Sequence, residues 1–346
     1  MKKIFIVFMI LPMLLVSVNA QELEVPQAPS SSQPYMPHES QSLGDGLLYI
    51  LSKACSELLP SISEAVQTSA VLIAAVLVLS FMGSYAGTTK RVAELVGIVF
   101  VASVLLQSAN ALIHLGANTI AELDSYGKLL IPVMTTALAS QGGVTKSAAL
   151  YAGTTLFSSV LTTILSKLFI PMMYIFLALC IANRAVGEDI LSSIKRFIKW
   201  LMSWLLKLVL YIFTGYITLT GVVSGSADAI ALKATKITVS GVVPVVGSII
   251  SDASEAILVS AGVMKNTAGI YGIFAFLAIC IGPFLKIAVQ YILLKATAAI
   301  CGIFGVKNTC GLIEDFSQTM GLLLAATGSI CLMLLITTVV FMKGVQ

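Results

Sequence analysis

The chain has 346 residues, of which 58% are hydrophobic and 10% are charged, and its net charge at neutral pH is +4. Soluble domains carry about 25% charged residues, and a soluble chain this apolar would expose large aggregation-prone patches. The composition therefore excludes an ordinary soluble protein and predicts an all-α, polytopic helical integral membrane protein. Its basic residues are dispersed rather than gathered in a dense run, so we expect no nucleic-acid partner.

The first twenty residues, MKKIFIVFMILPMLLVSVNA, have the pattern of a secretory signal peptide. Two lysines precede an apolar run, Ile4–Val16, and small residues end at Ala20. An uncleaved first span is the alternative, but the apolar run is short for a crossing of about 20 residues. We therefore predict a signal peptide at 1–20 that is cleaved near Ala20, which places the mature N-terminus outside.

Residues 21–45 are rich in Pro, Ser, Gln and Glu and lack apolar periodicity. This composition predicts a disordered extracytoplasmic linker, followed by a polytopic membrane domain at 46–346. The first crossings are expected at Ala70–Tyr85 and Val92–Leu115. The basic loop between them, Thr88–Arg91, would then be cytoplasmic, as the positive-inside rule requires.

The apolar stretch Ala148–Ala185 allows two interpretations, because Pro171 interrupts it. It could form one long kinked crossing or a tight hairpin. The acidic stretch Ala121–Gly127 should lie outside and the basic segment after Ala185 inside, which requires an odd number of crossings between them. We predict one crossing at Ala148–Ala185 and a shorter, partly re-entrant piece at Leu129–Ala139.

The segment Glu188–Lys207 predicts an amphipathic helix, with apolar residues at helical spacing on one face and basic residues on the other. We interpret it as an interfacial helix on the cytoplasmic leaflet that meets anionic lipids or a cytoplasmic partner. A membrane-surface connector that only fixes the topology is the alternative. The basic face consists of Lys195, Arg196, Lys199 and Lys207.

The second half of the chain predicts four more crossings, for about seven in total. Under this topology Glu314 and Asp315 lie in an outside loop, Lys286 marks a cytoplasmic helix end, and the C-terminus is cytoplasmic. The four crossings are Leu208–Ser224, Ala256–Phe284, Ile287–Phe304 and Met320–Phe341.

Prolines at matching distances suggest an internal repeat. Pro132 and Pro171 are separated by the same number of residues as Pro244 and Pro283. Transporters often break helices at corresponding positions of two repeats, so we take Pro132, Pro171 and Pro283 as candidate helix breaks. A parallel duplication is one interpretation, and a coincidence of proline spacing is the other. The two copies would be 93–204 and 205–316.

The fourth proline lies in the stretch SGVVPVVGSIISDASEA, which interrupts an apolar region. Backbone groups freed by Pro or Gly must be satisfied by protein or water rather than by lipid. The stretch is therefore either a candidate pore or partner segment or an interfacial hairpin at the outer surface. Its candidate residues are Ser240, Gly241, Pro244, Gly247, Asp252 and Glu255.

The chain contains none of the short motifs that carry hydrolytic or nucleotide chemistry, such as HExxH, GxSxG with a partner histidine, or GxxxxGK[ST]. None of its six cysteines forms a CxxC pair, although a Cys301–Cys310 bridge stays open. We expect no enzyme activity, no metal and no cofactor. The predicted spans also contain no buried acid, which weakens an ion-coupled transporter. Small residues scattered along the spans allow close helix packing and a homo-oligomer.

The stretch Lys233–Gly272, with SGVVPVVG at its centre, resembles the signature region of the stage III sporulation protein AE family (SpoIIIAE). The signal peptide, the polar linker and the multi-span body with its basic segment also fit, and the resemblance covers roughly residues 45–346. It implies a multi-pass protein of the mother-cell membrane around the forespore. It also implies that the partners are the other SpoIIIA-operon proteins and, from the forespore side, SpoIIQ.

The resemblance further implies a permease-like component of a transenvelope channel. That channel would support forespore development and late σG-dependent gene expression, and the family supplies no catalytic residues to carry over. An independent small-molecule transporter is the alternative, and a structural assembly platform without a transport path is a third interpretation.

Overall fold

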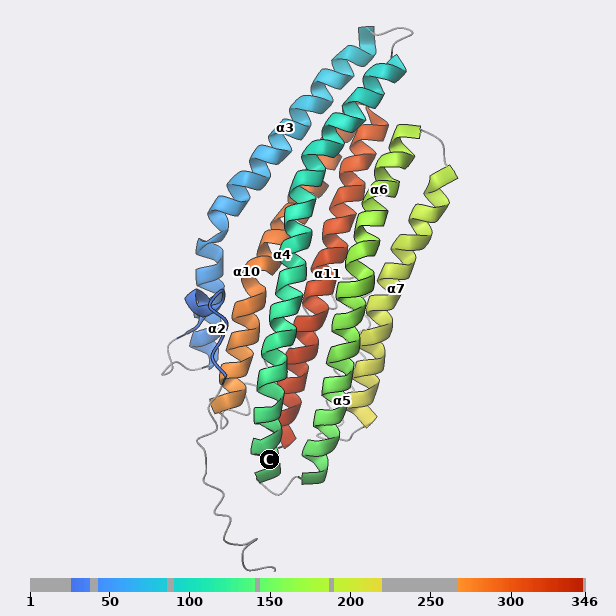
Figure 1. Ribbon diagram of the computed structural model, residues 1–346. Coiled ribbons are helices and arrows are strands. Elements are labelled where there is room, and N and C mark those ends of the chain that lie inside the picture. The colour runs from blue at the N-terminus through green and yellow to red at the C-terminus, as the bar shows by residue number, and fades with distance from the viewer. Residues whose placement is uncertain are drawn as a thin grey trace, which may run out of the picture.

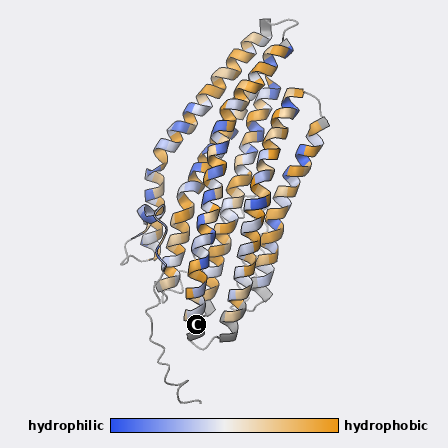
Figure 2. Cartoon of the chain, in the orientation of Figure 1, coloured by the Kyte–Doolittle hydropathy of each residue, from blue (hydrophilic) through white to orange (hydrophobic). Residues whose placement is uncertain are grey.

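The computed structural model describes residues 26–37, 43–85, 90–140, 144–186, 190–219 and 267–344. This part of the chain is a bundle of long helices without strands, and six of its helical segments are long and apolar enough to cross a membrane. The expected polytopic helical membrane protein is thus confirmed, and Figure 2 shows hydrophobic positions along the full length of the bundle. The main helices are α2 (Leu43–Ser56), α3 (Leu58–Tyr85), α4 (Lys90–Ser140), α5 (Val144–Thr163), α6 (Ile170–Val186), α7 (Ile190–Leu219), α10 (Thr267–Gly302) and α11 (Lys307–Gly344).

Helix α11 is the centre of the bundle. In its most apolar window 94% of the residues are buried, and it packs most extensively against α10 and α4 (Figure 1). Two glycines of α4 allow this close approach, because a Cβ atom at Gly116 or Gly127 would meet the side chain of Leu323 or Leu334. Small residues at helix contacts are the usual device for bringing membrane helices together.

Helix α4 differs most from the sequence-based expectation. It has 51 residues and is about 76 Å long at ~1.5 Å per residue, far longer than a hydrocarbon core of ~30 Å. The predicted outside loop Ala121–Gly127 and the predicted re-entrant piece Leu129–Ala139 are both turns of this helix, so both predictions were wrong. The acidic residues do not need a loop, because Asp124 accepts hydrogen bonds from Lys128 (2.6 Å) and Thr162 (2.9 Å).

The single kinked crossing at Ala148–Ala185 is confirmed. Helices α5 and α6 are joined without a loop by a six-residue π-helical segment, Ile164–Phe169. Pro171 follows directly, and the N–H of Ile170 donates to the carbonyl of Leu165. A π-turn before the proline re-pairs backbone groups that the proline ring would leave unpaired.

The two crossings predicted at Ala256–Phe284 and Ile287–Phe304 were wrong in the described part of this region, where α10 is continuous from Thr267 to Gly302. Pro283 lies inside α10 without ending it. The N–H that a proline lacks removes a single hydrogen bond and does not force a turn. Helix α11 begins at the end of the bundle where α3 ends and runs down to the opposite end, where α10 begins (Figure 1).

The basic segments predicted to be cytoplasmic do lie at one end of the bundle. The Arg91 guanidinium, at the start of α4, donates to the carbonyl of Val186 at the end of α6 (3.3 Å). Helix α7 starts at this same end and carries Lys195 and Arg196 in its first turns. The helix that was expected to lie on the leaflet is the first part of α7, which continues through most of the crossing predicted at Leu208–Ser224.

Part of the predicted disordered linker packs against the bundle, and we call residues 26–37 the N-terminal strap. The Ala28 N–H donates to the Tyr271 hydroxyl, and the Tyr126 hydroxyl donates to the carbonyl of Pro26, both at 3.2 Å. Tyr35, in a short 3₁₀ turn, donates to Glu57. Burial and this carboxylate raise the pKa of Tyr35 to about 12, so the phenol stays a donor at physiological pH.

Candidate functional site: a polar network on the central helix

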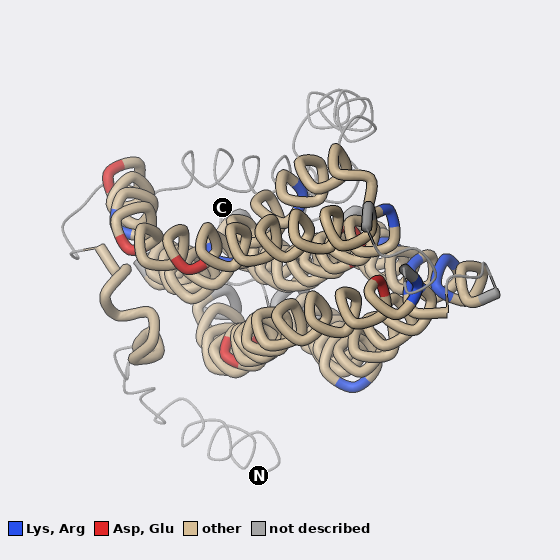
Figure 3. Tube along the Cα trace, turned by 90° about the horizontal axis from the view of Figure 1, so that it is seen from above, with Lys and Arg blue, Asp and Glu red and all other residues tan. Residues whose placement is uncertain are grey.

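A network of charged and amide side chains connects α6, α7, α10 and α11, and we call it the α11 network. Most positions along the bundle are uncharged, and the charged ones are gathered at a few places (Figure 3). The network is anchored on α11, the most buried helix; its Asp315 is buried, whereas its Lys295 and Glu314 side chains are 54% and 29% exposed. Its members are Arg184, Lys195, Lys199, Lys295, Glu314, Asp315 and Gln318.

Asp315 is the centre of the network, with a side chain that is only 4% exposed. The Lys195 ammonium lies 2.9 Å from both carboxylate oxygens. The Arg184 guanidinium donates to Oδ2 through Nε and Nη2, each at 3.2 Å. A carboxylate in an apolar interior is stable only when it is paired and hydrogen-bonded. Two cations therefore pair with the Asp315 carboxylate at this position.

Gly311 makes room for this ion pair. It lies one helical turn before Asp315, and a Cβ atom at this position would overlap the guanidinium of Arg184. The absence of a side chain lets the arginine reach across from α6 and lie against the backbone of α11. Residues four apart share one face of a helix, so the glycine and the aspartate together form a seat for Arg184.

A second set of contacts lies beside Asp315, on the neighbouring face of α11. Lys199 donates to Oε1 of Gln318 (2.8 Å), and Nε2 of Gln318 donates to Glu314 (3.2 Å). Glu314 in turn forms an ion pair with Lys295 of α10. Linked polar groups in a medium of low dielectric constant polarise one another and hold one arrangement. The named members include four cations and two carboxylates, so the network carries surplus positive charge.

Two of the four residues of the predicted basic face of α7 turn inward, against the expectation. Lys195 and Lys199 face α11, while Trp200 and Trp204 are half exposed and stack on each other at 6.0 Å between ring centroids. A helix inside a lipid bilayer turns its apolar face outward and its polar face toward other helices. The amphipathic periodicity of α7 therefore indicates the opposite orientation from that of a helix on the membrane surface. Arg196 and Lys207, the other two residues of that face, are exposed.

The candidate helix breaks lie in three different settings. Pro132 lies inside α4, near the end that precedes α5. Pro171 follows the π segment described above, and Pro283 lines a cavity between α4, α10 and the N-terminal strap. The candidate pore or partner residues Ser240, Gly241, Pro244, Gly247, Asp252 and Glu255 lie outside the described residues, so their role and the internal repeat stay predictions.

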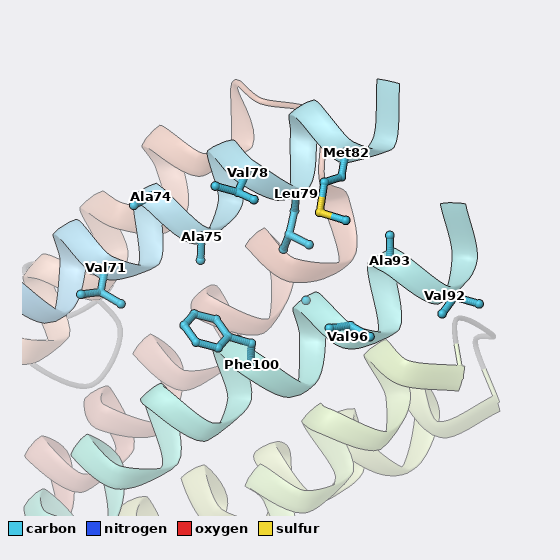
Figure 4. A pocket seen from close by; sticks show the side chains of 11 residues that line it. Val71, Ala74, Ala75, Val78, Leu79, Met82, Val92, Ala93, Val96 and Phe100 are labelled. Atoms are coloured by element: carbon cyan, nitrogen blue, oxygen red, sulfur yellow. The ribbon is translucent and has the colours of Figure 1, made fainter. Parts of the chain in front are cut away.

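An apolar groove of about 910 Å³ separates α3 from α4 near the end where the two helices connect (Figure 4). Its lining includes Val78, Val96 and Phe100, and these side chains are about half exposed. Such a surface suits lipid chains, and it carries none of the polar groups that distinguish the α11 network.

Sequence reasoning missed the acidic members of the network, because it placed Glu314 and Asp315 in an outside loop. Asp315 pairs with Lys195, which was predicted to be cytoplasmic. An outside position for Asp315 and a cytoplasmic position for Lys195 could not both hold. A usable signal was present: Gly311 to Met320 contains no proline and no cluster of turn residues. Glu314 and Gln318 also have the i, i+4 spacing of a helix face.

The family model for stage III sporulation protein AE matches residues 38–344. The chain belongs to the stage III sporulation protein AE family. A relative from Bacillus subtilis (strain 168), stage III sporulation protein AE, is 22% identical over 258 residues, which cover 74% of this chain and 65% of that protein. The chain thus aligns with less than two thirds of the length of this relative. No solved structure matches.

The whole α11 network lies within the range that defines this chain as a SpoIIIAE protein, whereas the N-terminal strap precedes it. Family membership establishes a sporulation protein with membrane-spanning helices. The network adds buried ionisable groups to that description, and within a membrane such groups are functional candidates by default.

Proposed function

We propose that this SpoIIIAE protein is the membrane-embedded, permease-like component of the SpoIIIA–SpoIIQ transenvelope channel. It would act in the mother-cell membrane around the forespore, with the other SpoIIIA-operon proteins as partners and SpoIIQ across the intermembrane space. Its role would be to support forespore development and late σG-dependent gene expression. In this proposal the protein is not an enzyme.

The α11 network carries the proposal. An inert scaffold could fill its centre with apolar side chains, which membrane interiors accommodate at no electrostatic cost. This protein instead holds Asp315 of α11, its most buried helix, against Arg184 of α6 and Lys195 of α7. Burying charges in an apolar medium costs free energy even when they are paired. Such groups line solute or ion pathways in many membrane proteins.

Replacing the network charge while keeping its shape tests this function. Asp315→Asn retains volume and some hydrogen bonding but removes the negative charge. We expect a large loss of heat-resistant spores in the protein's own host, with the protein still inserted in the membrane and still co-purifying with its SpoIIIA partners. Glu64→Gln, at an exposed position of α3, is the matched control and should leave spore yield unchanged.

Three results would redirect the proposal. Normal spore yield with Asp315→Asn would contradict a functional network, whereas loss of partner association would favour the assembly platform. Solute flux through liposomes that contain the purified protein alone would favour the independent transporter. In the proposed channel, flux requires the partner proteins and falls with Asp315→Asn. Contact of the exposed Arg196 and Lys207 with anionic lipids stays a prediction. Formation of a homo-oligomer also stays a prediction.

A further inference from the structure

A second polar site lies apart from the α11 network, between α4 and α10. A cavity of about 260 Å³ opens there beneath the N-terminal strap. Its volume is that of roughly nine liquid waters at ~30 Å³ each, which suits a ligand of amino-acid size and excludes a nucleotide or a folded peptide. The polar and charged side chains that line it come from the strap, α4 and α10: Ser31, Tyr35, Asn118, Thr119, Glu122 and Lys286.

The cavity carries one charge of each sign, on different helices. Glu122 of α4 is half-buried and accepts a hydrogen bond from the Ser31 hydroxyl (2.8 Å), which leaves its remaining lone pairs for another donor. Lys286 of α10 is exposed at the mouth. A ligand with an ammonium at one end and an oxyanion at the other would match this pair, since charge-assisted hydrogen bonds are the strong ones.

Pro283 removes one backbone donor from the α10 wall of the cavity. A proline has no N–H, so it cannot donate to the carbonyl of Ile279, which also lines the cavity. A helix that frees a carbonyl inside a membrane protein does so where water or a ligand can satisfy it. Ile279 and Pro283 both belong to the wall that carries Lys286.

The strap forms the roof of the cavity. Its four hydrogen bonds to the bundle reach α4 and α10 and the junction of α2 and α3. Gly282 allows the roof to lie close, because a Cβ atom there would be 3.1 Å from the Tyr35 hydroxyl. A segment held by a few polar contacts can open without unfolding the helices beneath it.

From these features we infer that the strap cavity binds a small zwitterion, with Glu122 receiving its ammonium and Lys286 its carboxylate or phosphate oxygens. Two sources share this chemistry: a free solute such as an amino acid, and the headgroup of phosphatidylethanolamine. The inference does not depend on whether the protein forms a channel, because it concerns occupancy of this cavity alone.

Thermal unfolding of the full-length protein in detergent tests the inference. L-alanine and phosphoethanolamine serve as zwitterionic probes, and methylamine and acetate serve as half-ligands. We expect saturable increases in Tm with the zwitterions, and at most a small increase with either half-ligand at equal concentration. Equal effects of zwitterions and half-ligands, or no effect of either zwitterion, would overturn the site, and neither comparison requires a mutant to fold.

Charge removal on each side then assigns the contacts. Glu122→Gln and Lys286→Met should each weaken the apparent Kd of L-alanine by about tenfold or more, as expected for loss of one charged hydrogen-bond partner. Lys286→Arg should restore most of the affinity. The controls Glu64→Gln and Lys307→Met remove the same charges from exposed positions outside the cavity and should change nothing. Equal weakening by the controls would contradict the assignment.

Nanodiscs distinguish the two sources. If the natural ligand is a free solute, L-alanine raises Tm equally in phosphatidylglycerol discs and in discs that also contain phosphatidylethanolamine. If it is the lipid headgroup, phosphatidylethanolamine raises Tm by itself and abolishes the response to L-alanine, and Glu122→Gln removes both effects. An increase in Tm with phosphatidylethanolamine that Glu122→Gln leaves intact would place the lipid elsewhere and count against the headgroup.

Discussion

Helices α3 and α11 have almost the same mean hydropathy in their most apolar stretches, yet they occupy opposite positions. Helix α11 is surrounded by the bundle, whereas the stretch that contains α3 is mostly exposed along one side (Figure 1). Buried polar groups fill α11, including Thr327, Ser329 and Thr337, while large apolar side chains such as Leu59 and Val78 cover the surface of α3. In a bilayer, apolar character does not mark the interior; satisfied polar groups do.

Removing the Asp315 carboxylate should produce the largest effect, because this buried group of α11 pairs with two cations from other helices. Asp315→Ala leaves Arg184 and Lys195 buried without their anion, and we expect a loss of about 3–5 kcal/mol in the free energy of unfolding in detergent micelles. Chemical denaturation followed by tryptophan fluorescence measures it, since Trp200 and Trp204 lie on α7.

The matched change on α3 is Glu64→Ala, which removes an exposed carboxylate. We expect it to alter the free energy of unfolding by less than about 0.5 kcal/mol. Equal changes in the free energy of unfolding for Asp315→Ala and Glu64→Ala would show that the position of an acid on the central helix does not contribute to stability.

A pair of leucines makes the same comparison with apolar side chains. Leu323→Ala removes a completely buried side chain that packs against Gly116, and we expect a loss of about 2–5 kcal/mol. Leu59→Ala removes a side chain of α3 that is 69% exposed, and in micelles it should cost less than about 0.5 kcal/mol. A cost for Leu59→Ala close to that of Leu323→Ala would mean that the outer face of α3 is covered in the folded protein.

The glycine seat of Arg184 should give the smallest of the three effects. Gly311→Ala pushes the guanidinium away from Asp315, and overpacking of this kind costs about 1–3 kcal/mol. Gly215→Ala is the control, because a Cβ atom at that position meets nothing within 4 Å. This control should be neutral or slightly stabilising through the higher helix propensity of alanine. A neutral Gly311→Ala would show that Arg184 has room to move.

Much of the helical organisation could be predicted from single features of the sequence. The single crossing at Ala148–Ala185 was predicted, although the parity argument behind it wrongly placed Ala121–Gly127 in an outside loop. The common position of Arg91 and Lys195 at one end of the bundle followed from the positive-inside rule. The second prediction holds because it depends on composition and on the side of the membrane, and not on which helices touch.

The predictions that failed share one cause. Ala121–Gly127, the Phe284–Ile287 junction and the Glu314–Asp315 pair were interpreted as loops or helix ends because they contain charges or a proline. Each lies inside a long helix, where a partner from another helix satisfies the charge or the chain tolerates one missing hydrogen bond. Those partners are distant in sequence, so local pattern reasoning had no access to them.

The sequence by itself determined the class of the protein, because a chain this apolar can satisfy its backbone in lipid only as helices or a closed barrel, and its spans have the length and composition of helices. It also predicted the amphipathic character of α7 and the family. Tertiary structure alone decided which face of α7 points inward, that Asp315 lies at the centre, and that the strap roofs a cavity with Glu122 and Lys286. The physical reason is that a buried charge is acceptable only beside its counter-charge, and only the packing of the helices brings the two together.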